Sequence, residues 1–93
     1  MDARPKRKRA VALKYNAEES QAPTIAAKGQ GEIAERIIAL AEQHEVPLYE
    51  DPDLVEVLSA IDLGREIPEE LYKAVAEVLA FIYRMNGTFA KKT

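Results

Sequence analysis

The sequence predicts a small α/β domain in which a mixed sheet of about three strands is surrounded by about three helices. Three observations lead to this fold class. Short apolar runs, typical of strands, alternate with longer stretches whose apolar residues recur every three or four positions, typical of helices. Proline and acidic residues precede two of these stretches, as they do at helix starts. The length of 93 residues and the hydrophobic content of 47% suit one domain with one core.

The first part of the predicted sheet comes from two short runs. Residues 1–9 are a basic leader with almost no apolar side chains, and we expect them to be disordered. Residues 10–15 and 24–28 are the first two predicted strands, and the polar residues 16–23 form the loop between them. Alanine is a weak strand former, so propensity alone gives the second strand limited support.

A helix and a third strand follow. The glycines at 29 and 31 break the strand pattern, and a helix is predicted from Glu32 to about His44, since Pro47 disfavours helical geometry in the residue before it. Residues 46–49 are the third predicted strand. Residues 24–49 therefore form a βαβ unit with parallel strands and a right-handed crossover. The apolar face of its helix contains Ile33, Ile37, Leu40 and Ala41.

Two further helices complete the predicted fold. Asp51 and Pro52 are a helix-start signal, with the carboxylate as N-cap acceptor and the proline at the first position, and Gly64 ends this helix. Pro68 starts the last helix, which closes at Asn86. We therefore expect residues 10–87 to be a single domain and residues 88–93 to be a frayed tail. The stripe of the last helix contains Leu71, Val75, Val78, Leu79 and Ile82.

The charge is divided unevenly along the chain. Residues 1–15 carry a net charge of +5 and the whole chain −3, so the rest of the chain is strongly acidic. An acidic body argues against a dedicated nucleic-acid domain, and the basic leader is more typical of a solvated tail than of a nucleic-acid or lipid contact. The sequence has no cysteine and no apolar run long enough to cross a bilayer. We therefore expect a cytoplasmic protein with neither disulfides nor a transmembrane segment.

No arrangement of side chains in the sequence is typical of a catalytic, metal or nucleotide site. His44 is the single histidine, and a helix-terminal residue is a better interpretation of it than a metal ligand. The serines have no partner histidine for nucleophilic catalysis. Lys28-Gly29-Gln30-Gly31 lies at a strand-to-helix junction but lacks the spacing of a P-loop, so its glycines are interpreted as turn residues. We expect a binding module without enzyme activity, metal or small-molecule cofactor.

Three segments share their order and spacing with a known family. They are residues 10–15 with 22–31, residues 46–52, and residues 63–80. Together they resemble the C-terminal cytoplasmic domain of the FlhB/YscU export-switch proteins of type III secretion, and the resemblance covers nearly all of residues 10–84. The resemblance implies a protein-binding component of a flagellar or injectisome export apparatus, at the cytoplasmic face of the export gate.

The resemblance also names partners and a site. The implied partners are export substrates and export-gate proteins, and the chain could substitute for the family's C-terminal fragment in substrate recognition. The alternative function is a small nucleic-acid-associated protein that uses the basic leader. The residues expected to contribute to an apolar docking patch are Ala22, Pro23, Ala76 and Leu79.

One reaction of the family is not expected here. Family members cleave themselves within an Asn-Pro-Thr-His motif placed directly before the strand that resembles residues 10–15. Residues 5–9 stand at that place and contain neither the asparagine nor the histidine, so we expect the chain to stay uncut. The family's sheet has a further strand before the motif. An edge of the sheet in this chain is therefore expected to be open.

Overall fold

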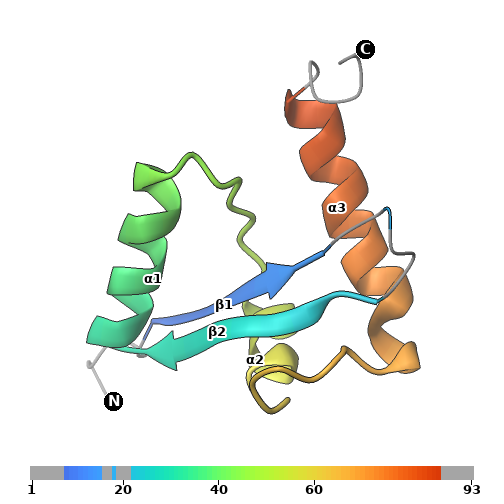
Figure 1. Cartoon of the computed structure of the whole chain (residues 1–93), viewed down its shortest axis with the longest axis horizontal. Helices are drawn as coiled ribbons and strands as arrows, with labels where there is room; N and C mark the ends of the chain where they lie inside the picture. The colour runs from blue at the N-terminus through green and yellow to red at the C-terminus, as the bar shows by residue number, and fades with distance from the viewer. Residues whose placement is uncertain (1–7, 16–17, 19–21, 87–93) are drawn as a thin grey trace, which may run out of the picture.

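The computed structural model describes residues 8–15, 18 and 22–86, and within them two strands and three α-helices are formed. The predicted α/β class with about three helices is confirmed. Figure 1 shows α1 and α3 standing at opposite ends of a two-stranded hairpin, with α2 beneath it. Of the predicted leader and tail, residues 1–7 and 88–93 lie outside the described part. The elements are β1 (Arg9–Lys14), β2 (Thr24–Gln30), α1 (Glu32–Gln43), α2 (Pro52–Leu58), the 3-10 helix η2 (Glu69–Leu71) and α3 (Tyr72–Asn86).

β1 and β2 pair antiparallel with one irregularity. The register is regular from Arg9 to Ala12 and then shifts, so that Leu13 pairs with Ile25. Ala26 is the extra residue of this bulge. Successive strand residues point to opposite faces, so a regular register would place Ala26 opposite Leu13 and turn Ile25 away. The bulge thus lets Leu13 and Ile25 face the same core.

The predicted third strand, and with it the parallel βαβ unit, is wrong. Residues 46–49 run as an irregular extended segment between α1 and α2 and pair with no described strand. The Val46 N–H donates to the Ala41 carbonyl, 2.8 Å away. The Tyr49 ring packs edge-on against Phe81 of α3, with centroids 5.1 Å apart. A strand-forming sequence becomes a strand only where another backbone lies beside it, and here none of the described residues does so.

A later segment, not predicted as a strand, covers the outer edge of β2. Ile25 donates its N–H to the Arg65 carbonyl at 3.0 Å and accepts from the Gly64 N–H at 2.8 Å. Ile67 donates to the Pro23 carbonyl at 3.0 Å. A single antiparallel bridge joins Thr24 to Glu66. Residues 64–67 therefore take the place at this edge that a further strand would fill.

α2 is shorter than predicted. Its start is confirmed, because the Asp51 carboxylate accepts from the Leu54 N–H at 3.1 Å with Pro52 at the first position. The helix ends at Leu58 rather than near Gly64, since the Ile61 N–H bonds back to the Leu58 carbonyl and tightens the chain into a turn. Gly64 follows in the left-handed region, with φ of 84°, where a glycine is favoured.

The core lies on the face of the hairpin that carries Leu13 and Ile25. α2, the turn after it and α3 all contribute side chains to this face, so it is sealed by segments far apart in the sequence. The cluster consists of Ile25, Leu58, Ile67 and Val75, with Val11, Leu13, Ala22, Leu54, Ile61, Leu71 and Leu79 packed around it.

α1 packs on the opposite face of the hairpin, where the residues are small. A Cβ on Gly29 would lie 2.8 Å from the Ile33 Cβ, so the glycine permits a close approach of the helix rather than a turn. Gly31, with φ of 63°, is the turn residue. Ala34 is fully buried, while Ile33 and Leu40 of the predicted apolar face are 58% and 54% exposed. The one buried residue of α1 therefore lies in its first turn, next to the end of β2. None of the described helices is long and apolar enough to span a membrane.

Candidate functional site

The four residues predicted to form a docking patch differ in exposure. Ala76 is exposed, Ala22 and Leu79 are half-buried, and Pro23 is buried. Ala22 and Leu79 both pack against the core cluster, so the end of the loop before β2 and the middle of α3 each contribute to its rim. A partner at this surface can reach Ala76 directly, but only the outer atoms of Ala22 and Leu79.

The backbone around Pro23 fixes the direction of α3. The Pro23 carbonyl accepts from the Ile67 N–H, which ties the start of β2 to the segment that leads into the helix. Pro68 then has an extended conformation, and the Leu71 N–H donates to its carbonyl at 2.9 Å to begin η2. Val75 is 1% exposed and points into the core. Ala76 follows it by one residue and is therefore turned outward.

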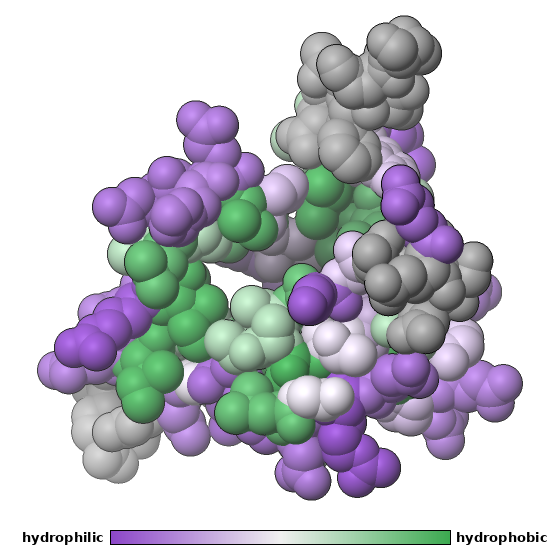
Figure 2. Space-filling model, viewed as in Figure 1, coloured by the Kyte–Doolittle hydropathy of each residue, from purple (hydrophilic) through white to green (hydrophobic). Residues whose placement is uncertain are grey.

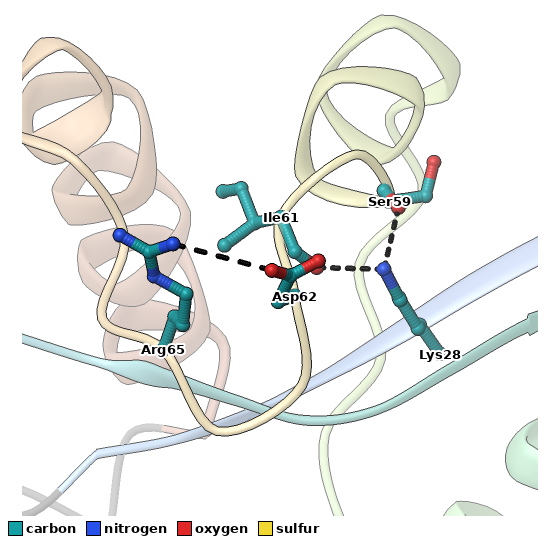
Figure 3. A network of polar contacts seen from close by, with 5 residues as sticks. All are labelled: Lys28, Ser59, Ile61, Asp62 and Arg65. Carbon is teal, nitrogen blue, oxygen red and sulfur yellow. Dashed lines mark hydrogen bonds and ion pairs between the residues drawn. The ribbon is translucent and has the colours of Figure 1, made fainter.

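A lysine clasp holds the turn between α2 and the covered edge of β2. Lys28 Nζ donates to the Ser59 carbonyl at 3.0 Å and to the Ile61 carbonyl at 2.7 Å (Figure 3). These carbonyls lie at and just beyond the C-terminus of α2, where a cation is favourable. Arg65 and Asp62 approach to 4.0 Å, but both side chains are at least 70% exposed, so this ion pair adds little. The clasp therefore positions residues 59–67.

A second apolar surface was not singled out from the sequence. Figure 2 shows the molecule hollowed between α1 and α3, with hydrophobic surface on both sides of the hollow. On α3, Phe81 and Met85 are 38% and 68% exposed and lie four residues apart, beside Val78 on one flank of the predicted stripe. That spacing is the signal by which they could have been found. The exposed large apolar residues of α1, of the segment between α1 and α2 and of this flank of α3 are Ile33, Leu40, Val46, Leu48, Tyr49, Phe81 and Met85, whereas Tyr72 and Tyr83 are exposed on the other flank of α3.

The phosphate and metal interpretations gain no support from the geometry. The Lys28 ammonium, the only cation of the Lys28–Gly31 segment, is engaged by two carbonyls on the face opposite α1. The first turn of α1 carries the acidic Glu32 and Glu35, which oppose an anion there. His44 is an exposed C-cap residue of α1, as predicted. Among the residues that the structure describes, no group of three His, Asp or Glu side chains could hold a metal ion.

The model of the FlhB HrpN YscU SpaS family matches residues 7–82. The flagellar biosynthetic protein FlhB of Aquifex aeolicus is 45% identical over 74 residues, which are 78% of this chain and 21% of that protein. The Bacillus subtilis protein YlqH is 39% identical over 85 residues, which are 91% of each chain. The chain thus spans about a fifth of FlhB and nearly all of YlqH.

Solved structures have the same fold. The crystal structure of the PscU C-terminal domain matches with a TM-score of 0.76 and 26% identity, covering 81% of this chain and 96% of that one. The cytoplasmic domain of FlhB from Shewanella putrefaciens matches with a TM-score of 0.73 and 36% identity, covering 81% of this chain and 61% of that one. The fold is therefore that of the PscU C-terminal domain and of the FlhB cytoplasmic domain.

Proposed function

Because the chain belongs to the FlhB HrpN YscU SpaS family, we propose that it is a protein-binding component of a flagellar or type III export apparatus. It works by docking and not by catalysis, at the cytoplasmic face of the export gate. Its partners are export substrates and gate proteins, and it takes the part of the C-terminal domain of longer relatives in recognising them.

The surface around Ala76 is the main support for this proposal. Ala76 is exposed on α3 directly beside the core cluster, and the half-buried Ala22 and Leu79 pack against that same cluster. Small exposed apolar residues next to a rigid core form a surface on which an apolar partner side chain can rest. The hydrogen bond from Ile67 to Pro23 fixes the two walls of this surface relative to each other.

The proposal is tested by replacing Ala76. Ala76→Glu introduces a charge that a docked apolar partner would bury, so we expect capture of export substrates and gate proteins from native cells to fall about tenfold or more. Stability should change by less than about 0.5 kcal/mol, because the position is exposed. Ala39→Glu, the same change at an exposed position of α1, is the matched control and should capture as the unaltered protein does.

Two results would count against this function. Equal capture of export proteins by Ala76→Glu and the unaltered chain would remove the docking surface. Recovery of nucleic acid in place of export proteins, lost steeply with added salt, would favour the alternative that uses the basic leader.

We also propose that the chain stays uncut. Residues 5–9 contain no asparagine whose side-chain amide could attack its own backbone carbonyl, and residues 5–7 lie outside the described part. The intact mass of the purified protein should therefore equal the full-length value after long incubation at mildly alkaline pH. A discrete fragment that begins near residue 5 or 6 in protease-free protein would restore a cleavage-linked role.

A further inference from the structure

β1 has an edge that no described residue covers. It pairs with β2 alone, whereas the other edge of β2 is bonded to residues 64–67. Apart from the ladder with β2, no backbone hydrogen bond joins residues 9–14 to any other described residue. Unpaired N–H and C=O groups along such an edge are a template for a further strand.

Hydrogen bonds next to the hairpin fix which groups face this edge. The Gly31 N–H donates to the Lys8 carbonyl at 2.8 Å, so the backbone N–H and C=O of Lys8 point toward β2. In an antiparallel pair, residues two apart face the same way. On the other side of the bulge, Ile25 directs both its N–H and its C=O to residues 64–65, so its partner Leu13 faces away from β2. Both observations give the same three residues whose backbone N–H and C=O groups point to the open edge, namely Arg9, Val11 and Leu13.

The space beside the edge suits an apolar chain. In Figure 1 the edge of β1 opens between α1 and α3, and in Figure 2 hydrophobic surface lies on both sides of the hollow there. The extended segment between α1 and α2 runs toward this space. Its Leu48 and Tyr49 are 49% and 43% exposed, and their backbone groups bond to none of the described residues. An added strand would find apolar contacts as well as main-chain partners.

The charges on β1 select the occupant. Arg9 and Lys14 stand at the two ends of the strand, both exposed, and neither forms an ion pair with a described residue. In an antiparallel pair, outward-facing residues lie opposite outward-facing residues, so a second copy of β1 would pair about Val11. That pairing sets Lys8 opposite Lys14 at both ends, and like charges directly opposite are unfavourable. A strand with acidic ends would instead form two opposite-charge pairs.

We propose that the β1 edge binds an extended segment of a partner protein, apolar in its centre and acidic at both ends, which adds a third strand to the sheet. Main-chain hydrogen bonds to Arg9, Val11 and Leu13 supply the affinity, and the terminal cations supply the selectivity. This site is separate from the surface around Ala76, so it goes beyond the proposed function and can stand or fall without it.

Hydrogen exchange on the full chain tests the edge. In the free protein, the amides of Arg9, Val11 and Leu13 should exchange faster than those of Ala10 and Lys14. The probe is a capped six-residue peptide, Glu-Val-Thr-Val-Thr-Glu, and its addition should slow the exchange of the three outward amides. The same peptide with lysine at both ends should bind about tenfold more weakly, since two cross-strand charge pairs change sign.

Two variants make the test decisive. The double variant Arg9→Glu with Lys14→Glu changes only exposed ends of the strand and should reverse the preference between the two peptides. Ala76→Glu should bind the acidic peptide as the unaltered chain does, which separates this edge from the other surface. Outward amides that are already protected in the free monomer, or protected equally by both peptides, would overturn the proposal. Protection that rises with protein concentration alone would assign the edge to a second copy of the chain.

Discussion

The two outer edges of the β1–β2 hairpin differ in their backbone hydrogen bonding. The outer edge of β2 is bonded to residues 64–67 through Pro23 and Ile25, and its side chains enter the core. The outer edge of β1 is bonded to no described residue, and cations stand at its ends. Strand sequences alone therefore do not decide whether an edge is covered. The segment that arrives from far along the chain decides it.

The largest expected difference between the edges is in core packing. Ile25→Ala removes a side chain that is 1% exposed, and we expect a loss of about 3 kcal/mol of unfolding free energy, because a cavity remains at the centre of the cluster. Val11→Ala on β1, where the side chain is half-buried, should cost about 1 kcal/mol. Urea unfolding of both variants measures the difference. Equal losses would mean that the covered edge contributes no more to stability than the open one.

A smaller effect is expected from the clasp that supports the covered edge. Lys28→Met keeps an unbranched apolar stem but removes the donor to the Ser59 and Ile61 carbonyls, and we expect a loss of about 1–2 kcal/mol. Lys14→Met makes the same change at an exposed position of the hairpin and should stay within about 0.5 kcal/mol. Thermal and urea unfolding check both. If Lys14→Met proved the more damaging change, the clasp would not be what positions residues 59–67.

Local signals in the sequence predicted several elements correctly. Asp51 and Pro52 set the start of α2, and Pro68 set the start of the last helical segment. The stripe of α3 is also confirmed, since its apolar members are buried or half-buried. These signals act within one or two helical turns, so the residues that produce them and the structure they produce are neighbours in the chain.

Signals that depend on distant segments failed. Residues 46–49 have the composition of a strand, but pairing requires a neighbour that sequence spacing cannot supply. The early end of α2 could not be read either, because the lysine at its carbonyls comes from β2. For the candidate site, the resemblance placed Ala22, Pro23, Ala76 and Leu79 around one region. Their unequal exposure depended on how residues 22–23 and α3, which are far apart in the sequence, pack against the same core.

The distance along the chain between the two partners of the covered edge also bears on the order of folding. The hairpin joins Lys14 to Thr24, while the covered edge joins Ile25 to Arg65. Closing the longer loop costs about 1 kcal/mol more chain entropy, and contacts of greater sequence separation form more slowly. We therefore expect the hairpin to form before residues 64–67 arrive. During that interval neither outer edge of the β1–β2 hairpin is hydrogen-bonded. Folding chains at high concentration are then most prone to pair their strands with those of another chain.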